Sequence, residues 1–480
     1  PETPRDQEST SGKGFPVPYL LNVLYVLLLV ALSPWLLWQA ATKGKYRQGW
    51  GQKLLGLSPI RQGSAPCVWL HAVSVGEVNL LAPLLTELAR QKPDWQFAIS
   101  TTTQTGYALA QKKYAEHTVF YCPLDFSWAV NRALRRLRPN LLVLAELELW
   151  PKLMSVAKKQ GAAVAVVNGR LSDNSFRGYR RVRWFVASLL QKLDLVAAQN
   201  DTYAERFLAL GAPADRVCVT GSIKFDGANP DRQNPRTSKL RALAGIDHSD
   251  RVWLAGSTQE PEEEVAVRVF QQLVAAHPQL RLVIVPRHPE RFASVAKMIA
   301  QSGLPWQRRS DLKADGRRES RWQILLVDTV GELGAWWGTA QLALVGGSLG
   351  NRGGQNMIEP AAYGAAVCFG PNTRNFRDVV LALLDRQAPV LLPDEAALEA
   401  FLARCLSDEA YATELGRRAQ QFVAEQQGAT AVTAAKLLYL VSTGVDAGRG
   451  AGTTHVATKS PHYLSTSEER LPGSQTRHSY

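Results

Sequence analysis

The chain has 480 residues, and a typical domain has about 100–200, so its length favours two domains with appendages. Hydrophobic residues make up 46% of the chain and charged residues 20%, a composition that excludes wholesale disorder. The formal net charge of +13 suits an anionic partner, which is nucleic acid, anionic lipid or a phosphorylated small molecule, and the charge alone does not choose among them.

The first element predicted along the chain is a membrane-anchoring helix at residues 18–41. Residues 1–17, rich in Pro, Gly and Ser, are typical of a disordered lead-in. No charged side chain occurs from residue 19 to residue 41, and a helix of this length spans about 30 Å, enough for a bilayer core. A cleaved signal peptide is the alternative, but the stretch is long for one and lacks a small-residue cleavage site.

Basic residues directly after this helix indicate its orientation. Cytoplasmic flanks of membrane helices carry an excess of Lys and Arg, so the large C-terminal body is predicted to lie on the cytoplasmic face. The basic residues are Lys43, Lys45, Arg47 and Lys53.

Two repeats of one pattern follow, over residues 42–228 and residues 229–443. In each, short continuous apolar runs such as 141–146 alternate with amphipathic stretches. Continuous hydrophobicity is typical of strands covered on both faces, so the pattern predicts parallel sheets between helices. The fold class is therefore α/β, with two doubly wound Rossmann-like domains facing a cleft. Residues 226–239 indicate a linker, and residues 444–480 a disordered tail.

Candidate residues of the first domain are carboxylates at strand ends. Glu77 opens a helix, whose dipole favours an ionised carboxylate that can accept a proton from a hydroxyl group, unless burial opposes it. The local pattern alone favours the alternative, a first-turn glutamate that only stabilises the helix dipole. Glu146 and Glu148 end a later strand, either as functional groups or as structural partners of Arg170.

Candidate residues of the second domain lie at strand-to-helix turns. The turn at residues 256–258 offers N–H groups and hydroxyls to an anion, and Arg287 with His288 suits phosphate or base contacts. The strongest local signal is the glycine-rich loop at residues 346–359, which enters a helix. Such a loop binds phosphate through backbone N–H groups, and a carboxylate there can accept ribose hydroxyls. The spacing matches neither GxGxxG nor the P-loop, so a nucleotide-sugar site is the better fit.

No metal or other cofactor is expected. The folded region contains no DxD motif, and the cysteines lack the spacing of zinc ligands. A nucleoside monophosphate leaving group could be stabilised by helix N-termini and basic side chains alone.

Eight motifs occur in a fixed order along residues 19–441: SVGE, ELELWP, NGRLS, TGSIKFD, AGST, VPRHPER, GEL and GGSLxxxGGQNxxEPAxxG. In these motifs the chain resembles the bacterial Kdo (3-deoxy-D-manno-octulosonic acid) transferases. The resemblance implies an inverting, metal-independent GT-B glycosyltransferase that transfers Kdo from CMP-Kdo to a lipid A precursor in lipopolysaccharide biosynthesis. It implies the inner membrane as location, a phosphorylated glycolipid as partner, and no nucleic acid.

The resemblance also implies roles for residues. Glu77 corresponds to the catalytic base. Gln259 and Gln355 stand where the family often has histidine, so a charge-assisted phosphate contact there would be weaker. The first-domain site residues are Ser74, Gly76, Glu146, Glu148 and Arg170. The donor-binding residues are Lys224, Ser257, Thr258, Arg287, His288, Gly331, Glu332, Leu333, Ser348, Gly353, Gly354, Asn356 and Glu359.

Two alternatives stay open. One is another membrane-associated GT-B transferase that uses a UDP-sugar and a lipid acceptor. The other is a membrane-tethered module that binds anionic lipid or nucleic acid, although nucleic-acid-binding motifs are absent from the sequence. Basic segments at residues 132–138 and 177–183 could bind a phosphorylated head group or could be ordinary solvated helix faces.

Overall fold

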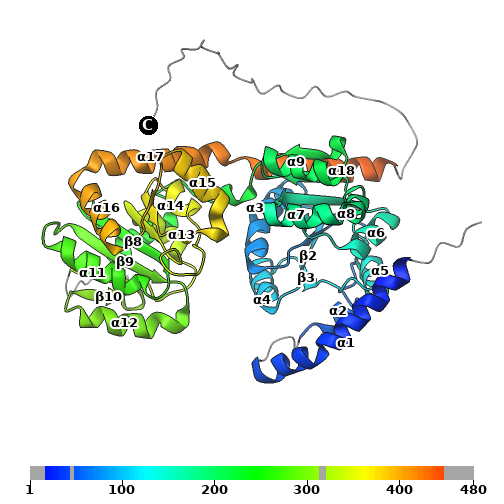
Figure 1. The fold of residues 1–480 in the computed structure, drawn as a ribbon, viewed down its shortest axis with the longest axis horizontal. Coiled ribbons are helices and arrows are strands. Elements are labelled where there is room, and N and C mark those ends of the chain that lie inside the picture. The colour runs from blue at the N-terminus through cyan, green and yellow to red at the C-terminus, as the bar shows by residue number, and fades with distance from the viewer. Residues whose placement is uncertain (1–16, 44–47, 313–320, 448–480) are drawn as a thin grey trace, which may run out of the picture.

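The computed structural model describes residues 17–43, 48–312 and 321–447. They form two α/β domains, each built on a seven-stranded parallel sheet with helices on both faces (Figure 1). The predicted α/β class with two parallel-sheet domains is therefore confirmed.

The first domain has the strand order β3-β2-β1-β4-β5-β6-β7. Its strands form because their residues are apolar on both faces, and every residue of β1 and β4 is buried. The strands are β1 (Cys67–His71), β2 (Gln96–Thr101), β3 (Thr118–Tyr121), β4 (Leu141–Ala145), β5 (Ala163–Gly169), β6 (Leu195–Ala198) and β7 (Val217–Val219). The helices are α2 (Trp50–Leu55), α3 (Val75–Gln91), α4 (Gln104–Lys113), α5 (Ser127–Leu137), α6 (Pro151–Lys159), α7 (Asp173–Arg181), α8 (Arg183–Leu190) and α9 (Asp201–Leu210), with short 3₁₀ turns at Ala214–Arg216 and Ile223–Phe225.

The second domain repeats this topology with the order β10-β11-β9-β8-β12-β13-β14. Its strands are β8 (Arg251–Thr258), β9 (Leu280–Pro286), β10 (Trp306–Arg308), β11 (Ile324–Leu326), β12 (Leu342–Val345), β13 (Ala366–Phe369) and β14 (Val390–Leu391). The helices are α10 (Pro235–Ala244), α11 (Glu262–Val274), α12 (Phe292–Gln301), α13 (Leu333–Trp336), α14 (Ile358–Ala362), α15 (Arg377–Asp385), α16 (Glu395–Ser407) and α17 (Glu409–Gln426). Short 3₁₀ turns lie at Pro289–Arg291, Arg309–Asp311, Trp337–Thr339 and Arg374–Phe376.

The last described helix, α18 (Ala429–Ala447), returns to the first domain. Its buried residues Ala434, Leu437 and Val441 join the core that α3 forms against the sheet, and Figure 1 shows α17 over one domain and α18 over the other. Asp226 accepts the backbone N–H groups of Gly428 and Thr430, so the two crossings of the chain between the domains lie side by side. The range predicted for the second domain, 229–443, thus includes a helix that packs on the first. An apolar helix face predicts that the helix packs on a hydrophobic core, but the sequence does not show which domain provides that core.

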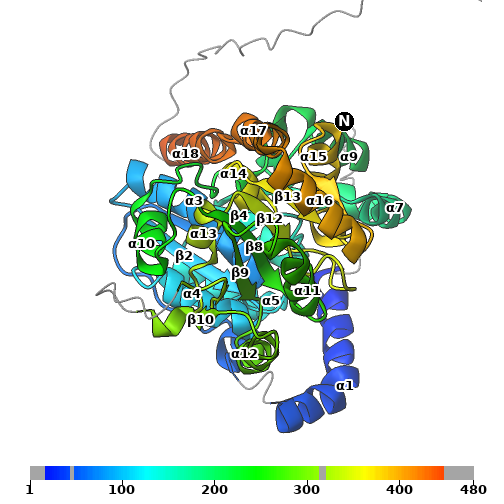
Figure 2. The ribbon, with the colours of Figure 1, turned by 90° about the vertical axis from the view of Figure 1, so that its left-hand side faces the viewer.

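The N-terminal helix α1 (Val17–Lys43) forms over the range predicted for the anchor and contains Pro34. Its first half packs on the first domain, where Asn22 and Ser127 exchange hydrogen bonds. The remainder diverges from the body in both views (Figures 1 and 2). Among the described residues, no helix is long and apolar enough to cross a membrane, so the predicted spanning segment is not confirmed. Apart from Val17 and residues 444–447, the predicted lead-in and tail lie outside the described residues.

Candidate active site

The two sheets place the candidate residues at equivalent positions. In each sheet the strand order reverses at one point, between β1 and β4 in the first domain and between β8 and β12 in the second. Open parallel sheets bind ligands outside the carboxyl ends of the strands at such a switch point. The predicted glutamates follow β1 and β4, and the predicted donor turns follow β8 and β12. Motifs far apart in the sequence are thereby brought together within each domain.

Glu77 lies on the first turn of α3 and is held by three hydrogen bonds. Ser74 caps the helix by accepting the N–H of Glu77 (3.3 Å), and its hydroxyl donates to Oε1 of Glu77 (2.8 Å). The N–H of Val73 donates to Oε2 (2.9 Å). Burial raises the pKa of Glu77, these hydrogen bonds oppose the rise, and the charge of Glu146 adds to it. The net direction is upward, so burial outweighs the helix terminus that was expected to keep the carboxylate ionised.

Glu146 and Glu148 lie at the end of β4 in different environments. Glu146 has a left-handed backbone (φ 56°), and its carboxylate forms an ion pair with Nζ of Lys224 (2.9 Å). Glu148 accepts a hydrogen bond from the indole of Trp150 (3.1 Å). Burial raises the pKa of Glu148, and the charges of Glu77 and Glu146 raise it further. The three glutamates therefore influence one another and form a single carboxylate cluster.

Arg170, which follows β5, has a different partner from the one predicted. Its guanidinium pairs with Asp378 of α15 in the second domain (3.1 Å), and the hydroxyl of Tyr203 donates to the same carboxylate (2.5 Å). The structural alternative, in which Glu146 or Glu148 pairs with Arg170, is not the arrangement seen, because Lys224 pairs with Glu146. The sequence gives no sign of an ion pair between residues of two domains.

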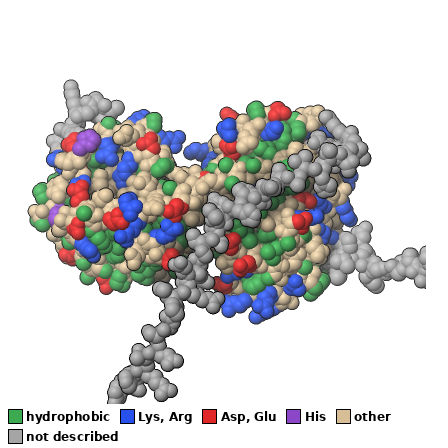
Figure 3. All heavy atoms as spheres, turned by 90° about the horizontal axis from the view of Figure 1, so that it is seen from above, with side chains coloured by type: hydrophobic (Ala, Val, Ile, Leu, Met, Phe, Trp, Pro, Cys, Tyr) green, Lys and Arg blue, Asp and Glu red, His purple; other side chains and the backbone are tan. Residues whose placement is uncertain are grey.

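An interdomain pocket of about 250 Å³ lies between these residues. Figure 3 shows the two domains as separate lobes with a hollow between them. Arg170 and Lys224 line the pocket from the first domain, and Asn375 and Asp378 line it from the second. Lys224, predicted as a donor-binding residue, thus stands on the first-domain wall beside the carboxylate cluster.

The turns after β8 and β12 are in direct contact. Ser257 has a left-handed backbone (φ 55°), and a Cβ atom at Gly346 would lie 2.5 Å from its carbonyl oxygen, so only glycine fits there. Thr258 is fully buried, and its side chain interacts with Glu263, where it opposes the rise in pKa that burial causes. The N–H of Arg287 donates to the carbonyl of Thr258 (2.9 Å), which brings the exposed Arg287 and His288 to the same edge.

The start of the glycine-rich loop is already occupied by a carboxylate. Glu262, buried on α11, accepts the backbone N–H groups of Gly347 (2.7 Å), Ser348 (2.8 Å) and Leu349 (3.0 Å). The hydroxyl of the buried Ser348 donates to Val345 and accepts the N–H of residue 370. The Ser348 hydroxyl thus has structural partners in the protein, and its predicted contact with the donor stays a prediction. Sequence reasoning missed Glu262, since an acidic run on a first helical turn usually indicates an exposed face.

Later in the loop, glycine conformation is again required. Gly353 (φ 91°) and Gly354 (φ 75°) both have left-handed backbones. The side chain of Asn375 donates to the carbonyl of Gly354 (3.2 Å), which links the loop to the wall of the interdomain pocket. Gln259 and Gln355 lie close together, because a Cβ atom at Gly347 would lie 3.3 Å from Nε2 of Gln259 and 3.2 Å from Nε2 of Gln355.

The turn before α13 and the turn before α14 are adjacent. Glu359 accepts a hydrogen bond from Asn356 (3.1 Å), and a Cβ atom at Gly334 would lie 3.6 Å from its other oxygen. Burial raises the pKa of Glu359, and the hydrogen bond from Asn356 opposes this rise. Glu332, in contrast, is engaged by Arg309 (2.7 and 2.9 Å) and by the hydroxyl of Thr329 (2.7 Å). Glu332 is thus held in place by residues of its own domain, and the predicted contacts of Gly331, Glu332 and Leu333 with the donor stay predictions.

Comparisons with known proteins agree with this architecture. A family model described as "3-Deoxy-D-manno-octulosonic-acid transferase (kdotransferase)" matches residues 47–227. The 3-deoxy-D-manno-octulosonic acid transferase of Bordetella pertussis is 33% identical and covers 85% of this chain and 96% of its own. The enzyme of the same name from Haemophilus influenzae is 31% identical and covers 76% and 86%. Among solved structures, a glycosyltransferase from Rickettsia africae shares the fold, with a TM-score of 0.51 at 13% identity over 80% of this chain and 99% of that one.

Proposed function

Since this chain belongs to the 3-deoxy-D-manno-octulosonic acid (Kdo) transferase family and is a glycosyltransferase, we propose that it transfers Kdo from CMP-Kdo to a lipid A precursor. Membership confirms the resemblance drawn from the eight motifs. The proposed reaction between CMP-Kdo and a lipid A precursor rests on one observation: the carboxylate cluster lies at the β1/β4 switch point, next to a pocket lined by residues of both domains.

Glu77 is the general base of the proposed reaction. Its carboxylate takes the proton of an acceptor hydroxyl as that oxygen attacks the anomeric carbon of Kdo, and the bond from this carbon to the CMP phosphate breaks. Direct attack inverts the configuration. The hydrogen bonds from Val73 and Ser74 fix the carboxylate, while burial strengthens it as a base by raising its pKa.

The second domain holds the donor in this proposal. Glu262 already binds the N–H groups at the start of the glycine-rich loop, so these groups are not assigned to the CMP phosphate. We assign the phosphate to the turn at Ser257 and Thr258 and to the backbone at Gly353, where the lack of a side chain lets a ligand come close. Arg287 supplies positive charge at the same edge. The ribose hydroxyls are assigned to Glu359, a partly exposed carboxylate at the neighbouring turn.

The acceptor reaches the cluster from the side of α1. A largely apolar pocket of about 540 Å³ lies between α1 and the loop that carries Glu148, with Tyr25, Leu29 and Trp150 in its wall. It suits the lipid part of an acceptor. Large apolar side chains of α1, among them Leu28 and Trp35, are also exposed to solvent, which supports contact of α1 with a membrane. The proposed location is the inner membrane, with the body on the cytoplasmic face.

Mass spectrometry of a lipid A precursor incubated with the purified full chain tests the proposal. With CMP-Kdo we expect the precursor to gain the mass of one or more Kdo residues, and with UDP-sugars we expect no change. Transfer only from a UDP-sugar would show that the donor assignment is wrong. Binding to nucleic acid or anionic lipid with no transfer from any donor would favour the binding-module alternative.

A further inference from the structure

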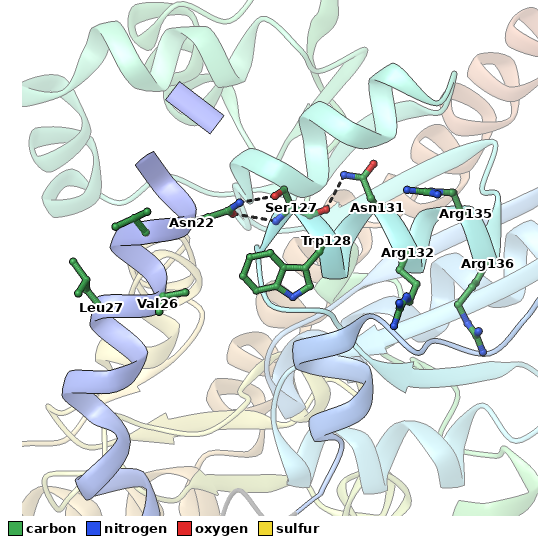
Figure 4. A pocket seen from close by; sticks show the side chains of 10 residues that line it. Asn22, Val26, Leu27, Ser127, Trp128, Asn131, Arg132, Arg135 and Arg136 are labelled. Carbon is green, nitrogen blue, oxygen red and sulfur yellow. Dashed lines mark hydrogen bonds between the residues drawn. The ribbon is translucent and has the colours of Figure 1, made fainter. Parts of the chain in front are cut away.

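A second groove lies between α1 and α5, on a different face of α1 from the pocket beside Glu148. Its volume is about 880 Å³, within the range of roughly 300–1,000 Å³ that is usual for ligand sites. The apolar wall consists of Val23, Val26 and Leu27, which are 55%, 41% and 62% exposed. Figure 4 shows Val26 and Leu27 of α1 on one side of the groove and α5 on the other.

The α5 wall is basic because the helix is amphipathic. Ala133, Leu134 and Leu137 face the domain core, which leaves a row of arginines on the outer face. Among the described residues that line the groove none is acidic, and none of its arginines forms an ion pair with a described carboxylate. The row consists of Arg132, Arg135 and Arg136 (Figure 4). The guanidinium of Arg132 donates to the carbonyl of Leu55 (3.4 Å) and that of Arg136 to the carbonyl of Ser58, whereas Arg135 makes no hydrogen bond to a described residue.

An indole lies between the apolar wall and the basic row. Trp128 is 47% exposed, stacks on Phe126 with ring centroids 4.6 Å apart, and donates its Nε1–H to the carbonyl of Leu54 (2.8 Å). Asn22 and Ser127 close one end by their mutual hydrogen bonds. Across the groove, the apolar side chains are followed by the tryptophan and then by the arginines. This order matches the layers of a bilayer surface, from acyl chain to head group.

We propose that this groove binds an anionic phospholipid of the bilayer, with an acyl chain along α1 and the phosphate among the three arginines. The lipid is not the sugar acceptor, because none of the glutamates of the carboxylate cluster lines this groove, whereas Glu148 lines the pocket on the other face of α1. The inference rests on the proposed membrane location, but it does not depend on sugar transfer. The site would fix the orientation of the domain on the membrane.

Photolabelling of the full chain in vesicles tests this site. The probes are phosphatidylglycerol and phosphatidylcholine carrying the same diazirine acyl chain, and labelled peptides are mapped by mass spectrometry. We expect phosphatidylglycerol to label peptides that contain residues 22–27 and 127–136, and phosphatidylcholine to label them several-fold less. Repeating the labelling with Glu77→Gln separates this result from the fate of the proposed reaction.

Substitutions make the test specific. Arg135 has no hydrogen bond to a described residue that its loss would break, and each basic residue near an anionic surface contributes about a fivefold gain in binding. Arg135→Gln should therefore reduce labelling about fivefold, while Arg236→Gln, an exposed arginine of α10, should not. Leu27→Gln should reduce labelling, whereas Leu208→Gln on α9, also exposed, should leave it unchanged.

Four results would overturn the proposal. Three are labelling outside the two peptides, equal labelling by the zwitterionic lipid, and unchanged labelling of Arg135→Gln and Leu27→Gln. The fourth is loss of labelling in the presence of excess lipid A precursor, which would assign the groove to the acceptor. Circular dichroism melting of each variant shows whether a loss of labelling reflects a loss of fold.

Discussion

The three glutamates of the carboxylate cluster differ in how their charge is balanced. Lys224 neutralises Glu146, whereas neither Glu77 nor Glu148 forms an ion pair with a described cation, and burial raises the pKa of both. Glu148 is held by an indole, while Glu77 is held by groups at a helix terminus. Only Glu77 combines a raised pKa with a fixed position at the end of β1, which favours it as the base.

Glu77→Gln should keep the shape of the side chain and remove its proton affinity. We expect kcat to fall about 10²–10⁴-fold, the usual contribution of a general base, with little change in the KM for CMP-Kdo. Initial rates from mass spectrometry of the lipid product check this. Glu87→Gln is the matched control, because Glu87 lies on the same helix and pairs only with Arg90 and Gln91. Full activity of Glu77→Gln would remove Glu77 from the mechanism.

Asp125 should make the stability of the first domain depend on pH. Burial raises its pKa from 3.8 to about 6, although its carboxylate accepts the N–H groups of Lys152 and Leu153 at the start of α6. Because the folded state binds the proton more tightly than the unfolded state, the contribution of Asp125 is most favourable below pH 3.8 and is lost as the pH rises through about 6.

Urea denaturation of the wild type and of Asp125→Asn, from pH 4 to pH 7, measures this effect. The free energy of unfolding of the wild type relative to Asp125→Asn should fall by up to about 3 kcal/mol over this range. Asp194, which is paired with Lys158, serves as the control position through Asp194→Asn. A difference that is constant with pH would show that the raised pKa of Asp125 is wrong.

At the scale of elements, the glycine-rich loop is organised by a glutamate that lies more than eighty residues earlier in the chain, at the start of a helix. The N–H groups that the sequence offered to a phosphate are bound by Glu262 at the start of α11. That carboxylate fixes the turn after β12 against the turn after β8, where Gly346 meets Ser257. The loop is thus shaped before any ligand binds.

Glu262→Gln should destabilise the second domain, because an amide has one acceptor oxygen where the carboxylate has two. Buried N–H groups left without a partner cost about 1–3 kcal/mol each, so we expect a loss of at least about 2 kcal/mol in the free energy of unfolding. Urea denaturation measures it, with Glu264→Gln, exposed on the same helix, as control. Equal stability of both variants would contradict the role of Glu262.

Prediction from sequence worked where the signal is local and stopped where a partner is distant. Continuous apolar runs such as those of β4 and β12 predicted both sheets, and strand ends predicted the placement of Glu77 and Glu146. The hydrogen-bond partners of Ser348 and Glu332 could not be predicted from the sequence, because the type of a side chain shows what it can bind and not which residue it binds in the fold.

At the scale of the whole molecule, Asp378 links the two domains through Arg170 and Tyr203. Part of this contact is exposed, so Asp378→Asn should change the free energy of unfolding by only about 1 kcal/mol or less. It should instead loosen the arrangement of the domains and lower kcat/KM several-fold. Small-angle scattering and initial rates measure both effects, with Asp385→Asn on the same helix as control. Unchanged scattering and rates in Asp378→Asn would show that this contact does not position the domains.

The return of the chain through Gly428 means that the first domain does not correspond to one continuous stretch of the gene. A fragment that stops at residue 228 would lack Ala434, Leu437 and Val441, and would expose the apolar surface of α3 and the sheet that these residues cover. Such a fragment should precipitate on its own and become soluble when a synthetic peptide of residues 429–447 is added. To study the first domain alone, residues 429–447 have to be added as a separate peptide or joined to it by circular permutation.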